Sequence, residues 1–119
     1  MFKKYDIVLW DLDPKKGHTQ SWTRPCVIVQ SNSLNKYAPT FILVPLTSTI
    51  KKPFPSEFVI KPSSFNGLSH ESRFLGSQII TLDKEFIAKK IWSLEEDYHE
   101  QVEQALDIVF DREKLFSKI

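Results

Sequence analysis

Short apolar runs separated by turn-forming residues fill the first half of the chain, at a spacing of about ten to fifteen residues. Runs this short and this regularly interrupted favour a small, strongly bent antiparallel β-sheet over a helical fold. Connections rich in proline, glycine and asparagine separate the later runs and are poor strand formers. We predict strands over residues 6–10, 25–30, 41–46 and 57–60, and a fifth that begins at 73–75 and continues past Gly76 through 78–81.

The end of the chain carries helical periodicity instead. Apolar residues recur there at the three- and four-residue intervals of one helix face: Tyr98, Val102, Leu106, Val109 and Phe110. Ser93, three residues before Glu96, matches a capping box and predicts that the helix begins at this point. No repeat or long linker divides the chain, so residues 1–119 are expected to form one α+β domain.

The overall charge does not indicate a nucleic-acid partner. The chain has 16 lysines and arginines against 15 acids, a net charge of +1, so any anion-binding site has to be a local patch. The single cysteine, Cys26, cannot close an intramolecular disulfide, and the first residues lack the apolar stretch of a secretory signal. No apolar run has the length of a membrane helix. We therefore expect a cytoplasmic protein without a membrane span.

A polar stretch over 17–25 places one arginine at the start of an apolar strand. Pro25 biases the preceding residue, Arg24, toward an extended backbone and so gives its side chain a defined direction. A guanidinium held in this way suits bidentate phosphate binding. The simpler alternative is an arginine that is solvated or paired with a nearby acid such as Asp11 or Asp13.

Two hydroxyl residues, Thr47 and Ser48, follow the apolar run 41–46. If the second and third predicted strands are neighbours, these hydroxyls converge with Arg24 on one patch and offer donors to phosphoryl oxygens. The alternative is that they hydrogen-bond their own turn, which is the usual function of Ser and Thr after a strand.

Other side chains near these loops are of types that suit RNA. His18 lies in the same polar stretch as Arg24, and an imidazole there is able to transfer a proton, although a surface histidine is the commoner case. Trp22 and Phe54 place aromatic rings in loops, where they either cover the edge of the core or stack on the bases of single-stranded RNA. His70 and His99 have no partner at a metal-binding spacing, so we predict no metal site.

Four motifs occur in chain order between about residues 5 and 110: Asp6-Ile7-Val8 before Asp11-Leu12-Asp13-Pro14, Gly17-His18-Thr19-Gln20 before Thr23-Arg24-Pro25, Val44-Pro45-Leu46-Thr47-Ser48, and Gln78-Ile79-Ile80-Thr81-Leu82-Asp83. Together they resemble the MazF/PemK family of toxin endoribonucleases. The resemblance implies a small SH3-like antiparallel β-barrel with a C-terminal α-helix, and a homodimer whose interface forms an RNA groove. It also implies a cognate antitoxin whose tail occupies that groove, and cleavage of single-stranded RNA at a short sequence without a metal or other cofactor.

The resemblance also assigns roles to individual residues. Arg24 and Thr47 match the usual catalytic pair of the family. His18 matches the loop histidine of the plasmid-borne branch, which makes it the candidate proton carrier. RNA contacts are expected from further residues of the motifs and loops: Gln20, Trp22, Ser48, Phe54 and Gln78.

The chain departs from the family pattern at four positions. Thr19 stands where an acid is usual, and Ile80 stands in place of an arginine. Leu75 and Ser77 stand where the plasmid-borne branch has an arginine and an acid, so those catalytic roles do not transfer. Two other functions therefore remain open: an SH3-like module that binds RNA or protein without catalysis, and a toxin of the same fold that poisons DNA gyrase through its terminal helix and tail.

Overall fold

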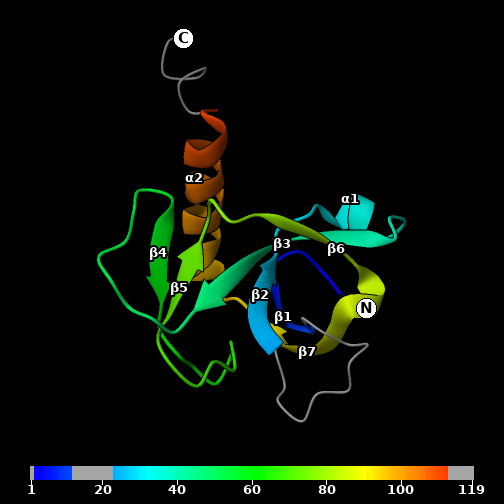
Figure 1. The fold of residues 1–119 in the computed structure, drawn as a ribbon, viewed down its shortest axis with the longest axis horizontal. Coiled ribbons are helices and arrows are strands. Elements are labelled where there is room, and N and C mark those ends of the chain that lie inside the picture. Colours follow the sequence, from blue (N-terminus) through cyan, green and yellow to red (C-terminus); the bar gives the residue numbers. More distant parts are fainter. Residues whose placement is uncertain (1, 12–22, 113–119) are drawn as a thin grey trace.

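The computed structural model describes residues 2–11 and 23–112, which form a curled antiparallel sheet and a C-terminal helix (Figure 1). The strands of this part are β1 (Asp6–Asp11), β2 (Thr23–Ile28), β3 (Thr40–Thr47), β4 (Glu57–Ile60), β5 (Ser72–Leu75), β6 (Ile80–Asp83) and β7 (Ile87–Ser93). The helical segments are α1 (Asn32–Asn35), the 3-10 turns η1 (Lys84–Phe86) and η2 (Glu96–Tyr98), and α2 (His99–Phe110). The predicted antiparallel fold with a terminal helix is confirmed.

Strand β3 is the centre of the sheet. The strand order is β4–β5–β3–β2–β1–β7, and β6 also pairs with β3. One side of β3 pairs with β2, whereas the other side is shared, because β6 pairs with residues 40–43 and β5 with residues 46–47. A strand that changes neighbours along its length turns a corner of the sheet, and the sheet curls into a half-barrel around it (Figure 1). This curl brings the end of β3 close to both β2 and β5.

The alternation of side chains along the central strands fills two apolar clusters, one on each face of the sheet. In β1, Ile7 belongs to the cluster that α2 covers, and Val8 belongs to the other. In β3, Val44 and Leu43 divide in the same way. Because both faces of β3 are covered, residues 43–46 are buried without interruption. The end of β3 is therefore rigidly held where its polar residues begin.

Helix α2 lies behind β4 and β5 in Figure 1 and covers the first cluster. The predicted apolar face is confirmed at Val102 and Leu106, which are buried, whereas Phe110 is exposed. The predicted start of the helix is wrong. Ser93 is the last residue of β7, where its Oγ donates to Asp6 Oδ1 at 2.9 Å, and α2 begins only after the η2 turn. None of the described helices is long and apolar enough to cross a membrane.

Two strand predictions need correction, and one observed strand was not predicted. Strand β2 begins and ends two residues earlier than the predicted 25–30. Segments 73–75 and 78–81 are not one strand, because a turn in which the Gln78 N–H donates to the Leu75 carbonyl at 2.8 Å separates β5 from β6. The sequence pattern gives no sign of β7, since the lysine pair at 89–90 interrupts its apolar alternation. It is extended because it pairs with β1 at an edge of the described sheet.

Candidate functional site

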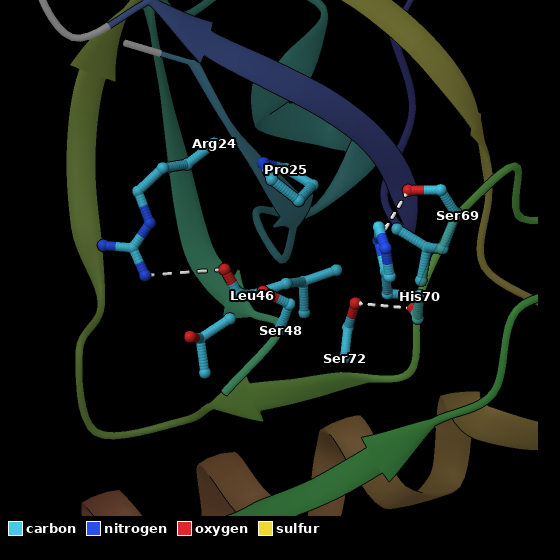
Figure 2. A pocket seen from close by; sticks show the side chains of 9 residues that line it. Arg24, Pro25, Leu46, Ser48, Ser69, His70 and Ser72 are labelled. Carbon is cyan, nitrogen blue, oxygen red and sulfur yellow. Dashed lines mark hydrogen bonds between the residues drawn. The ribbon is translucent and has the colours of Figure 1, made fainter. Parts of the chain in front are cut away.

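A cleft of about 370 Å³ opens where the end of β3 meets the start of β2 and the segment that leads into β5 (Figure 2). Its volume is within the range of small-ligand sites, about 300–1,000 Å³. Its lining comes from three distant parts of the chain: Arg24 and Pro25; Leu46, Thr47 and Ser48; and Leu68, Ser69, His70 and Ser72. A cation, several hydroxyls and an imidazole around a few apolar atoms suit a polar, anionic ligand.

Strand pairing sets the position of Arg24. Strands β2 and β3 pair so that Cys26 lies across from Pro45. Continuing this register by two residues brings Arg24 opposite Thr47, which is the convergence expected from the sequence. The half-buried Arg24 donates from Nη2 to the Leu46 carbonyl at 3.4 Å, a long hydrogen bond that orients the guanidinium along the cleft (Figure 2).

Thr47 is bonded to its own turn and also lines the cleft. Its Oγ1 accepts a hydrogen bond from the Thr49 backbone N–H at 3.2 Å. The alternative expected from the sequence, a hydroxyl that hydrogen-bonds its own turn, therefore applies to Thr47. A hydroxyl that accepts one hydrogen bond still has its own proton to donate. Thr47 can therefore close the turn and donate to a ligand at the same time, and Ser48 adds a second hydroxyl beside it.

The wall opposite Arg24 carries His70. Figure 2 shows these two side chains on opposite sides of the cleft. Ser69 Oγ is hydrogen-bonded to His70 Nδ1 at 2.9 Å, and Ser72 Oγ donates to the His70 carbonyl at 3.1 Å. In the sequence, His70 bears only on the prediction that the chain has no metal site, and no role in the cleft is predicted for it. No local motif signals its position, because the fold brings it to Arg24 through the pairing of separate strands.

A buried asparagine holds the connection that forms this wall. Asn66 is fully buried. Its amide nitrogen donates to the Lys61 carbonyl and to Glu95 Oε1, each at 2.9 Å. Its Oδ1 accepts from the backbone N–H groups of Ser63 at 3.1 Å and Leu68 at 3.0 Å. All four hydrogen-bonding positions of the amide are used, so the wall is preorganised before any ligand binds.

The thiol next to the cleft is inert. Cys26 is fully buried, and its Sγ contacts the Arg24 carbonyl at 3.7 Å. Burial raises the pKa of this thiol to about 12, and the nearby charge of Arg24 offsets only part of that increase. A protonated and inaccessible thiol is not a nucleophile near neutral pH. In the part of the chain that the structure describes, no group of three or more His, Cys, Asp or Glu side chains is placed to hold a metal ion.

The structure does not bring every predicted site residue into the cleft. Phe54 is 70% exposed in the connection between β3 and β4, and Gln78 is exposed in the turn before β6. Neither residue lines the cleft. Outside the described residues lie the three remaining candidates, His18, Gln20 and Trp22, and one of the two acids proposed as partners of Arg24, Asp13. The side chain of the other acid, Asp11, is not described either. Their roles stay predictions.

Sequence relatives cover almost the whole chain. The endoribonuclease MazF of Staphylococcus epidermidis is 38% identical over 109 residues, which is 91% of this chain and 90% of that protein. The protein of the same name from Staphylococcus saprophyticus is 37% identical with the same coverage.

Solved structures share the fold at lower identity. An endoribonuclease from a mycobacterial species, in complex with its cognate antitoxin, has a TM-score of 0.74 at 19% identity and matches 93% of this chain and 96% of its own. MazF in a MazE–MazF structure from Deinococcus radiodurans has a TM-score of 0.72 at 22% identity, with 92% and 96% covered. A family model described as the PemK-like, MazF-like toxin of type II toxin–antitoxin systems matches residues 3–110. The chain belongs to this family of PemK-like, MazF-like toxins.

Proposed function

We propose that the chain is an endoribonuclease toxin that cleaves single-stranded RNA at the cleft formed by Arg24 and Thr47. The observation that supports this most strongly is the β2–β3 register, which brings these two residues to one cleft. They are also the residues that match the usual catalytic pair of the family. The similar staphylococcal proteins are named endoribonucleases and are covered over nine-tenths of their length.

The proposed reaction is a transesterification without a metal ion. The ribose 2′-oxygen bonds to the adjacent phosphorus, and the bond from phosphorus to the 5′-oxygen breaks. One proton leaves the 2′-hydroxyl and one is added to the 5′-oxygen, which gives a 2′,3′-cyclic phosphate and a 5′-hydroxyl. The phosphorane between these states carries extra negative charge, so the reaction needs a cation, hydrogen-bond donors and proton carriers.

Arg24 is assigned to stabilise the extra negative charge of the phosphorane. Its guanidinium hardly deprotonates and is therefore a poor base, but it donates two parallel hydrogen bonds to phosphoryl oxygens. A preorganised donor of this kind lowers a barrier by about 3 kcal/mol, or roughly 100-fold in rate. Thr47 donates to the same phosphate and orients it for in-line attack, with Ser48 beside it. His18 is the proposed carrier for one of the two protons.

Further contacts would hold the RNA strand beyond the cleft. The exposed ring of Phe54 suits stacking on a base. We assign the same general role to three other residues that lie in or next to the family motifs: Gln20, Trp22 and Gln78. A homodimer with the RNA groove at its interface, an antitoxin that occupies the groove, and a cytoplasmic location complete the proposal. The mycobacterial relative was solved with its antitoxin, which supports the antitoxin part.

The test is to incubate the purified chain with a long single-stranded RNA in excess chelator and to map both ends of every fragment. We expect cuts at one short sequence with 2′,3′-cyclic phosphate ends. Arg24→Ala should cut roughly 100-fold more slowly, and Arg24→Lys, which keeps the charge but not the fork, should fall between. Cleavage that the chelator abolishes would overturn the metal-free reaction. A folded chain that makes no cuts would favour the binding module or the gyrase-directed toxin.

A further inference from the structure

We propose that His70 is a further catalytic residue, the general base that removes the proton from the 2′-hydroxyl; this inference rests on the proposed ribonuclease activity. His70 lies on a different part of the chain from the family motifs, in the connection before β5. It lines the same cleft as Arg24 and Thr47, and Figure 2 shows it across the cleft from Arg24.

The position of His70 is well defined although the residue is exposed to solvent. Its backbone carbonyl accepts from Ser72 Oγ at 3.1 Å, and Ser72 is the buried first residue of β5. On the other side, the hydrogen bonds of Asn66 tie the connection down through the backbone of Leu68. Both flanks of His70 are therefore anchored, which suits a group that has to meet a reacting atom at a fixed distance.

The ring itself is oriented by its neighbour. Ser69 Oγ lies 2.9 Å from His70 Nδ1. When Nδ1 carries the hydrogen and donates it to Ser69 Oγ, Nε2 carries no hydrogen. The lone pair of Nε2 is then the one that accepts a proton. The Ser69 hydroxyl is able to accept the hydrogen bond from Nδ1, so the contact accommodates the tautomer that a general base at Nε2 requires.

The chemistry of the cleft leaves this role to His70. Arg24 keeps its proton, and the serine and threonine hydroxyls of the lining do not accept protons near neutral pH. Histidine side chains change protonation state in that range. Among the described residues that line the cleft, His70 is the one able to take a proton there. As the 2′-oxygen bonds to phosphorus, its proton passes to Nε2. The 5′-oxygen leaves and takes a proton from a separate donor, for which His18 is the proposed residue.

The experiment compares wild type, His70→Ala, His18→Ala and the matched loop control Ser64→Ala, which lies in the same connection outside the cleft lining. Each protein cuts two short RNAs that contain the cleavage sequence mapped for wild type. One has the normal 5′-oxygen at the scissile phosphate, and the other has sulfur at that bridging position. A sulfur leaving group departs without a proton, so only variants that lack the general acid are restored by it. RNA binding and thermal unfolding are measured for every variant.

We expect His70→Ala to bind RNA as wild type does but to cut both RNAs roughly 100-fold or more slowly. Ser64→Ala should match wild type. If His70→Ala cuts within a few-fold of an active wild type, the inference is overturned and the proposed function stands. If the sulfur RNA restores His70→Ala, His70 is an acid and its assignment as the base is overturned. A folded wild type that cuts no RNA would overturn the proposed function and this inference together.

Discussion

Replacing Asn66 with alanine tests whether one buried side chain holds the wall of the cleft. The amide makes four hydrogen bonds of 2.9–3.1 Å, two as donor and two as acceptor. Each contributes a net of about 1 kcal/mol, which gives about 4 kcal/mol for the four together. The Lys61 residue is exposed, so its carbonyl can bond water in the variant. We therefore expect the free energy of unfolding to fall by about 3 kcal/mol.

For a chain of this length, a loss of this size lowers the midpoint of thermal unfolding by roughly 10–15 °C. Urea unfolding followed by circular dichroism measures the free energy directly, and thermal scans check it. Asn66→Asp is the informative comparison, because it keeps the shape but sets a second carboxylate against Glu95. It should be at least as destabilising at neutral pH and should recover when acid protonates one of the two groups. An Asn66→Ala loss below about 1 kcal/mol, with an unchanged denaturant slope, would refute the reasoning.

Two further predictions concern ionisable groups outside the cleft. Burial alone would raise the pKa of Glu103, but hydrogen bonds from Tyr5 and Lys4 outweigh it, so the pKa is lowered. A carboxyl with a lowered pKa stabilises the fold above its unfolded value, about 4.3, and this contribution is lost as the pH falls through the folded pKa. Tyr5→Phe should therefore reduce the amount by which the free energy of unfolding falls as the pH is lowered. An unchanged pH dependence would contradict the assignment. The buried Cys26, with its pKa raised to about 12, should react with a thiol reagent at neutral pH only as fast as the chain unfolds, and rapid labelling of folded protein would contradict its burial.

The central part of the site could be predicted from the sequence because its determinants are local. Pro25 and the apolar run that follows it predict a strand with Arg24 at its start, and the run over 41–46 predicts a strand that delivers Thr47. When two such strands are sequential neighbours, antiparallel pairing is the common outcome, and the register then places Arg24 near Thr47.

The far wall of the cleft could not be predicted, because it depends on tertiary pairing. His70 reaches the cleft only because β3 exchanges β6 for β5 along its length, and no residue pattern encodes that exchange. The false helix start has a similar cause. Ser93 and Glu96 have capping-box spacing, but pairing with β1 keeps Ser93 in a strand and gives its hydroxyl to Asp6. In both cases a long-range contact outweighs the local signal.

A double-mutant cycle on the cleavage rate tests the central claim most directly, namely that Arg24 and Thr47 act on the same phosphate. The four proteins are wild type, Arg24→Ala, Thr47→Val and the double variant, each assayed on the mapped RNA sequence in chelator. If both residues hold one phosphate, the second substitution should slow cleavage much less once the first is made. The coupling free energy between the two substitutions should be about 1 kcal/mol or more. Independent, additive losses would contradict the claim, as would wild-type cleavage in the double variant.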